Sequence, residues 1–212
     1  MSMAKNIAVL GGGSWATAIV KMLTNNVDKI HWWMRSQEAV DHVNKYHHNP
    51  NYLSSVSFEE GKLEVSTDLQ SIIEASDLVV LVIPSAFIQD AFKDLDQHIF
   101  QNKTVFSAVK GIVPELHSIA ARYLHKQYNM DYDHIGIICG PCHAEEVAME
   151  KLSYLTVACT NEDTAQEMAD LLACRYIKTS TTEDVFGTEI SAGYKSVVAI
   201  ASGICHGLGY GD

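Results

Sequence analysis

The chain has 212 residues, of which 47% are hydrophobic and 19% are charged. This length suits one domain, or one domain with part of a second, and the apolar content excludes a disordered or low-complexity chain. The formal net charge of −11 argues against a surface that wraps nucleic acid or lies on an anionic membrane.

The sequence also carries no targeting or cross-linking pattern. No apolar run reaches the roughly 20 residues that span a bilayer. The first six residues lead directly into a strand-like segment, without the features of a signal peptide. The five cysteines are scattered and suggest no disulfide framework. We therefore expect a cytoplasmic protein with reduced thiols.

Short apolar runs alternate with helical patterns along the first 182 residues. Strands are predicted, in chain order, at 6–10, 29–34, 63–66, 78–83, 104–107, 135–139, 154–158 and 176–179. Helices are predicted at 14–24, 37–46, 68–75, from about 85, at 114–128, shortly after 141, and at 163–174. This alternation is typical of an α/β fold with a doubly wound, mainly parallel sheet, in which ligands bind outside the carboxyl ends of the strands.

The pattern changes after Thr182. Apolar residues recur at three- and four-residue spacing and predict one face of a long helix: Phe186, Ile190, Tyr194, Val197, Ala201, Ile204 and Leu208. A second face is small and polar around the single lysine Lys195. We expect this helix to begin a mainly helical second domain.

A glycine-rich loop follows the first predicted strand and opens the first helix. Gly11, Gly13 and Ala16 fit the spacing G-x-G-x-x-G/A. The first glycine permits a tight turn, the second lets a pyrophosphate approach the backbone, and the small third residue lets helix and strand pack closely. This context predicts a Rossmann-type dinucleotide-binding domain over residues 1–182; the alternative is a tight turn of purely structural value.

The end of the second predicted strand bears on the choice of dinucleotide. An NAD site usually has an acidic residue there, but the sequence has Arg35 after Met34, and Asp28 lies at the other end of the strand. Arg35 is suited to a 2′-phosphate, which indicates NADP(H) or dual use. The alternative is an exposed loop arginine.

Two lysines are candidates for chemistry. Lys110 follows the strand 104–107 and would lie at the ligand end of the sheet, although a surface lysine is the simpler interpretation. Lys195 lies in mid-helix beside small residues, and a lysine near a second cation has a lowered pKa that suits acid–base work. The alternative for Lys195 is a side chain that runs along the helix edge to solvent.

Six ordered segments resemble the NAD(P)-dependent glycerol-3-phosphate dehydrogenases, especially the bacterial type. They cover residues 9–18 (VLGGGSWATA), 51–53 (NYL), 82–85 (VIPS), 108–111 (AVKG), 140–148 (GPCHAEEVA) and 187–212. The family's reaction is the reversible oxidation of glycerol 3-phosphate to dihydroxyacetone phosphate by NAD(P)+, which feeds glycerophospholipid synthesis.

The resemblance also implies roles for single residues. Cofactor contacts would come from Ser14, Trp15, Arg35, Tyr52, Lys110 and Ala144, beside Gly11 and Gly13. Substrate contacts would come from Lys110, Gly140 and Cys142. Lys195 would act as the catalytic acid–base, and Lys110 would stabilise developing negative charge. The implied partner is a small-molecule substrate, and the resemblance is compatible with a homodimer.

The sequence departs from the family pattern in several places. Cys142 stands where serine is usual, His143 where phenylalanine is frequent, and Ser196 where asparagine follows the lysine. Family members also continue into a helical substrate domain, so we expect residues 183–212 to be its first helix, truncated, and this chain alone to be weakly active or inactive. The alternatives are an NAD(P)-binding module without catalysis and another two-domain hydroxyacid dehydrogenase.

Two further groupings are not expected to be sites. The spacing Cys139-x-x-Cys142 lies late in the doubly wound pattern and has no second pair to complete a zinc site. His42, His47 and His48 are interpreted as part of a solvated loop. No metal site is predicted.

Overall fold

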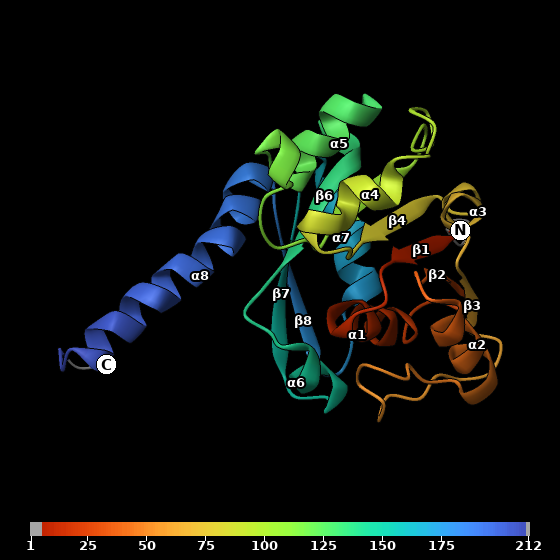
Figure 1. Ribbon diagram of the computed structural model, residues 1–212, viewed down its shortest axis with the longest axis horizontal. Coiled ribbons are helices and arrows are strands. Elements are labelled where there is room, and N and C mark those ends of the chain that lie inside the picture. The colour runs from red at the N-terminus through yellow and green to blue at the C-terminus, as the bar shows by residue number, and fades with distance from the viewer. Residues whose placement is uncertain (1–5, 211–212) are drawn as a thin grey trace.

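The computed structural model describes residues 6–210, which form an eight-stranded sheet with helices on both faces (Figure 1). The strand order is β3-β2-β1-β4-β5-β6-β7-β8. The strands are β1 (Ile7–Leu10), β2 (Ile30–Trp33), β3 (Leu63–Ser66), β4 (Leu78–Leu81), β5 (Thr104–Ser107), β6 (Ile135–Cys139), β7 (Ser153–Cys159) and β8 (Ile177–Thr182). Adjacent strands are parallel except β6 and β7, so the predicted mainly parallel sheet is confirmed.

The helices fall between the strands as predicted, with some shifted ends. They are α1 (Ser14–Leu23), α2 (Gln37–Tyr46), α3 (Leu69–Glu74), α4 (Ile88–Phe92), α5 (Ala120–Tyr128), α6 (Ala144–Ala148), α7 (Glu162–Leu172) and α8 (Val185–Gly207). Short 3-10 turns lie at η1 (Ser85–Phe87), η2 (Pro114–Leu116) and η3 (Tyr132–His134).

The core is divided by the sheet into two apolar layers. In β1, Ile7 and Val9 face the layer that contains α1, α2, α6 and α7, whereas Ala8 and Leu10 face the layer that contains α3, α4 and α5. All four side chains are fully buried. Helices on both faces explain why central strands such as β1 and β4 are continuous apolar runs. The edge strands β3 and β8 carry polar residues instead.

The prediction of one helix over 114–128 is wrong. The segment forms the turn η2, then His117 takes the left-handed conformation at φ 46°, and α5 begins only at Ala120. Across this turn the Val113 N–H donates to the Ser118 carbonyl, and the Ser118 N–H donates to the Val113 carbonyl. The backbone pairing uses groups that a continuous helix would need for itself, so the helix cannot extend back to Pro114. The helix predicted from about 85 likewise begins as the turn η1 before α4.

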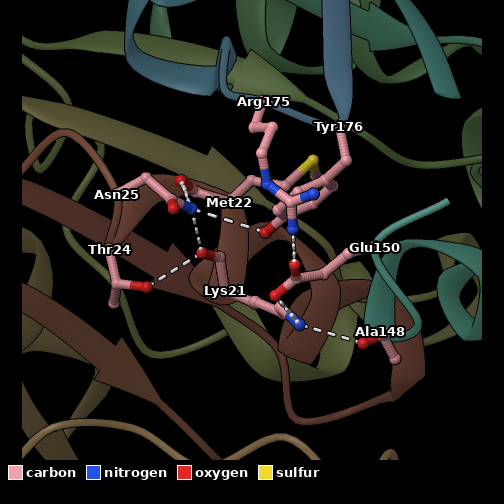
Figure 2. Close-up of polar contacts among 8 residues, drawn as sticks. All are labelled: Lys21, Met22, Thr24, Asn25, Ala148, Glu150, Arg175 and Tyr176. Carbon is pink, nitrogen blue, oxygen red and sulfur yellow. Dashed lines mark hydrogen bonds and ion pairs between the residues drawn. The ribbon is translucent and has the colours of Figure 1, made fainter. Parts of the chain in front are cut away.

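A polar cluster joins the end of α1 to the turns beside β7 and β8 (Figure 2). The Lys21 ammonium donates to the Ala148 carbonyl at 2.9 Å and pairs with Glu150 at 3.2 Å. Glu150 also pairs with Arg175. The neighbouring Tyr176 is buried, and this burial raises the pKa of its hydroxyl to about 12. Helices α1 and α6 both begin at the carboxyl edge of the sheet, and both carry predicted site residues. The contact between Lys21 and Ala148 holds these two helices together.

Helix α8 leaves the sheet and extends away from it (Figure 1). Its first turn is anchored, since Val185 and Glu189 are buried. Most of the predicted apolar face beyond this turn is exposed: Ile190, Tyr194, Val197, Ile204 and Leu208. No described helix is both long and apolar enough to cross a membrane. Gly211 and Asp212, which end the last segment quoted above, lie outside the described residues, as does the Ser196 side chain.

Candidate functional site

The carboxyl edge of the parallel strands brings together most of the predicted site residues. The glycine loop follows β1, Arg35 follows β2, Lys110 follows β5 and Gly140 follows β6. These four strands run in the same direction, so their carboxyl ends meet at one edge of the sheet. This is the edge at which ligands bind in doubly wound folds.

The glycine loop has the geometry that its sequence predicts. Gly11 has φ +140°, a conformation that residues with a side chain rarely adopt. A Cβ there would also lie 2.8 Å from the Val82 carbonyl oxygen, which is a steric clash. Gly13 is the extended N-cap of α1, and a Cβ there would meet no atom within 4 Å. The buried Ala16 faces the core. Gly11 thus maintains the turn, and Gly13 faces open space.

Three fully buried side chains hold the three carbonyl groups of the loop. The contacts are Trp32 Nε1 to the Gly11 oxygen at 2.7 Å, Asn49 Nδ2 to the Gly12 oxygen at 3.0 Å, and Thr17 Oγ1 to the Gly13 oxygen at 2.9 Å. Each of these side chains donates, and each carbonyl accepts. The orientation of three successive peptide units is therefore fixed from the interior of the domain.

The same contacts orient the N–H groups that follow each carbonyl. In a trans peptide the N–H points opposite to the C=O, and the described chain has no cis peptide. The N–H groups of Gly12, Gly13 and Ser14 are thus directed away from the three buried side chains, and none of them donates to another residue within 6–210. Free N–H groups at a helix N-terminus suit an anion such as a pyrophosphate. The loop therefore fits a dinucleotide.

Arg35 and Tyr52 both follow this loop in the sequence, and both side chains are exposed. The Arg35 guanidinium carbon is 5.9 Å from the centre of the Phe87 ring. The Tyr52 side chain is 47% exposed, and its backbone N–H donates to Asn49 Oδ1 at 3.2 Å. Both side chains are accessible to a ligand at this edge.

Lys110 follows β5, Cys142 follows β6 and Lys195 lies on α8, and the charges of both lysines act on the thiol. Burial raises the pKa of the Cys142 thiol to about 11, and the ammonium groups of Lys110 and Lys195 act in the opposite direction. Both charges thus lie within electrostatic range of the thiol, although both lysines are exposed. Lys110 Nζ is also 5.9 Å from the centre of the Trp15 ring, which connects this group to the glycine loop.

Gly140 and Ala144 flank the buried Cys142. A Cβ on Gly140 would lie 2.3 Å from the Tyr154 carbonyl oxygen, so only glycine fits against β7 here. Ala144 is buried at the start of α6. At ordinary pH the Cys142 thiol keeps its proton, so it can offer only a weak S–H donor where the family usually has a hydroxyl.

Sequence analysis missed two buried polar residues of this region. Asn49 is fully buried between the glycine loop and the Tyr52 segment. Its only sequence signal is the turn-forming pair Asn49-Pro50, which says nothing about burial. Glu189 is 3% exposed, and its carboxylate accepts from the Ala120 and Ala121 N–H groups at 2.8 and 3.2 Å.

Glu189 anchors α8 on the N-terminus of α5, which has no side-chain cap from its own segment. Burial raises the pKa of Glu189 to about 7, against the effect of the two hydrogen bonds. A hint was available in the sequence, since an acid within an apolar helical face must be paired if that face is buried. Its partners, however, lie 68 and 69 residues earlier in the chain.

The two groupings set aside on sequence grounds are also located. Cys139 and Cys142 are both free thiols, and His42 Nε2 lies 3.3 Å from His48 Nε2. His47 ends α2 in the left-handed conformation. Over residues 6–210, no three or more histidine, cysteine and acidic side chains are arranged to hold a metal ion.

Comparison with known proteins gives consistent matches. The family model "NAD-dependent glycerol-3-phosphate dehydrogenase N-terminus" matches residues 6–165. A glycerol-3-phosphate dehydrogenase [NAD(P)+] of Exiguobacterium is 35% identical over 98% of this chain and 61% of its own length. A Plasmodium falciparum glycerol-3-phosphate dehydrogenase structure has a TM-score of 0.85 at 25% identity, over 96% of this chain and 59% of that one.

A Coxiella burnetii glycerol-3-phosphate dehydrogenase structure has the same fold, with a TM-score of 0.86 at 24% identity. It is matched over 98% of this chain and 63% of its own. The chain thus spans about three fifths of the length of the proteins it matches.

Proposed function

The chain belongs to the NAD-dependent glycerol-3-phosphate dehydrogenase family, and from this premise we propose that it forms the cofactor-binding part of such an enzyme. The reaction is the interconversion of glycerol 3-phosphate and dihydroxyacetone phosphate with NAD(P)+ and NAD(P)H. The proposal includes a cytoplasmic location and a role in glycerophospholipid synthesis. It also assigns residues 1–182 to the dinucleotide-binding domain and 183–212 to the first helix of a substrate domain.

One observation carries the proposal. The free N–H groups of Gly12, Gly13 and Ser14 lie at the same edge of the sheet as Lys110. A bound dinucleotide with its pyrophosphate on these N–H groups would extend along this edge toward the lysine. Residues that would contact it are Ser14, Trp15, Arg35, Tyr52, Lys110 and Ala144.

We assign the chemical step to two lysines. When bound, the nicotinamide supplies the hydride that reduces the ketone. Lys195 donates a proton to the carbonyl oxygen of the substrate, and Lys110 stabilises the negative charge that develops there. Gly140 and Cys142 hold the substrate; because the Cys142 thiol is a weak donor, backbone N–H groups take a larger share of that contact.

Arg35 is proposed to bind the 2′-phosphate of NADP(H). It follows β2 where an NAD-specific site would have an acidic residue, and its exposed guanidinium can form two parallel hydrogen bonds to a phosphate. NADP(H) is then the preferred cofactor, with NAD(H) bound more weakly.

The test is a calorimetric titration of this chain with NADPH and with NADH. We expect both to bind, with NADPH tighter. Arg35→Ala should weaken NADPH about tenfold more than NADH, since one charged hydrogen-bonded contact is lost. Arg122→Ala, an exposed arginine on α5, is the matched control and should change neither affinity. A folded chain that binds neither nucleotide would refute the proposal.

A second function fits this chain taken alone: nucleotide binding without turnover. Lys195 is exposed on a helix whose apolar face is also exposed, so within residues 6–210 nothing encloses a substrate beside it. A turnover number near the enzyme median of about 10 per second in this chain alone would exclude that alternative.

A further inference from the structure

Asn49 occupies the junction between the glycine loop and the segment that carries Tyr52. Its side chain is fully buried and takes part in four hydrogen bonds. The amide nitrogen donates to the Gly12 carbonyl at 3.0 Å and to Thr17 Oγ1 at 2.9 Å. The amide oxygen accepts from the backbone N–H groups of Asn51 at 3.0 Å and Tyr52 at 3.2 Å.

These partners fix the orientation of the Asn49 amide. Two backbone N–H donors converge on one side-chain atom, so that atom is the oxygen, and the nitrogen faces the loop. An amide with every partner in place and no exposed surface has one available arrangement. Asn49 is therefore a rigid connection between two segments that are 37 residues apart at the Gly12 contact.

On the nitrogen side, Asn49 controls the direction of the loop peptides. Its bond to the Gly12 oxygen turns the following Gly13 N–H the opposite way, toward the open side of the loop. Its second bond, to the Thr17 hydroxyl, extends the effect, because that hydroxyl donates in turn to the Gly13 oxygen at 2.9 Å. The Gly13 and Ser14 N–H groups are thus both aimed by a chain of hydrogen bonds that begins at Asn49.

On the oxygen side, Asn49 holds the start of the segment between α2 and β3. The bond from the Asn51 N–H closes a turn of the kind that asparagine favours. The bond from the Tyr52 N–H fixes the backbone of a residue whose side chain is exposed beside the loop. Without Asn49, the Tyr52 backbone would lose its described link to the loop.

We propose that Asn49 is a positioning residue of the cofactor site, which sets both the phosphate-facing N–H groups and the Tyr52 segment before the nucleotide binds. This inference rests on the proposed dinucleotide function. It assigns Asn49 no contact with the nucleotide itself. Its contribution is that the loop does not have to reorganise on binding.

Two substitutions separate the two sides of the amide. Asn49→Asp keeps an oxygen for the Asn51 and Tyr52 N–H groups but replaces the donor to Gly12 with an acceptor. Asn49→Ala removes both sides. Asn161→Ala is the matched control, because Asn161 caps α7 through Thr164 at 3.0 Å and follows β7, which runs antiparallel to β6 and ends at the opposite edge of the sheet.

The readouts are the Kd for NADPH by calorimetry and the amide hydrogen exchange of Asn51 and Tyr52 in the nucleotide-free chain. Asn49→Ala should raise Kd about tenfold or more and speed both exchange rates, since a buried hydrogen-bonded connection is lost. Asn49→Asp should raise Kd to a similar extent while both amides stay protected. Asn161→Ala should lower the thermal midpoint without changing Kd or these exchange rates.

Three outcomes decide the matter. Wild-type affinity in Asn49→Asp would overturn the role of the donor, and wild-type affinity in a folded Asn49→Ala would overturn the whole inference. If the wild-type chain binds no nucleotide, the proposed function fails. In that case the exchange rates still test the connection, and unchanged rates in Asn49→Ala would refute it as well.

Discussion

The glycine loop carries the proposed cofactor site, and helix α8 carries the proposed acid–base residue Lys195. The loop is held by buried contacts along its whole length, whereas α8, within the described residues, is held only near its start. Every carbonyl of the loop is bonded to a buried side chain within the first 49 residues. Helix α8 is anchored through its first turn, where Val185 and Glu189 are buried, and Lys195 lies beyond that anchor on an exposed stretch.

This difference separates binding from catalysis. A preorganised loop can accept a nucleotide without further structure, because the cost of ordering it has been met by the fold. Lys195, by contrast, is exposed beyond the anchor of α8, and a general acid must be held within hydrogen-bond reach of its substrate. We therefore expect nucleotide binding to depend on the preorganised loop, and the proposed acid–base step to depend on the surroundings of α8.

The largest expected effect is at the acid–base end. In a form of the protein that includes the C-terminal length of its relatives, Lys195→Ala should lower kcat by about 10²- to 10⁴-fold, the usual contribution of a general acid–base. The Kd for NADPH should stay unchanged, because the loop is held without α8. Lys126→Ala, an exposed lysine on α5, is the control. Equal loss of kcat and of cofactor binding would point to a folding role for Lys195.

The next effect is on the loop itself. Gly11→Ala forces a side chain into the φ +140° conformation, 2.8 Å from the Val82 oxygen. We expect the free energy of unfolding to fall by about 2–4 kcal/mol and NADPH binding to be lost. Denaturant unfolding and calorimetry measure the two effects. A stable variant with normal affinity would show that the loop is less constrained than its contacts indicate.

The anchor of α8 should show in the pH dependence of stability. The pKa of Glu189 is raised from its ordinary 4.5 to about 7, so the folded state keeps a proton that the unfolded state releases. Its contribution to the free energy of unfolding is complete below pH 4.5 and is lost as the pH rises through about 7.

That pKa difference corresponds to a free energy of roughly 3 kcal/mol, since one pKa unit is worth about 1.36 kcal/mol. Glu189→Gln, which cannot ionise, should flatten stability over this pH range in urea unfolding at pH 5, 6, 7 and 8. Glu183→Gln, a residue that precedes α8, serves as the control. If the free energy of unfolding depends on pH in the same way in the wild type and in Glu189→Gln, the raised pKa of Glu189 is contradicted.

The smallest effect should be seen on the exposed part of α8. A Cβ at Gly203 would meet no atom within 4 Å, and the position is helical and exposed. Gly203→Ala should therefore raise stability by about 0.5–1 kcal/mol in this chain. Denaturant unfolding measures it, and the Kd for NADPH should not move. A loss of stability would mean that this stretch of α8 packs against something in solution.

The sequence determined the elements whose cause is local. The central strands of the sheet were predictable because both faces are covered, which makes strands such as β1 and β4 continuous apolar runs. The glycine loop was predictable because a tight turn between strand and helix requires glycine at the position of Gly11. Lys110 and Arg35 were located because both follow strands whose direction the alternating pattern implies.

Tertiary structure decided what depends on partners far away in the chain. The residue at which α5 begins could not be predicted from the sequence of 114–128. The N–H of Ala120, the first residue of the helix, donates to the Glu189 carboxylate, 69 residues later. The role of Asn49 could not be read either, because an asparagine beside a proline favours a turn whether or not its amide is buried. Burial and hydrogen-bond partners arise only when separate segments pack together, and these two polar side chains derive their roles from that packing.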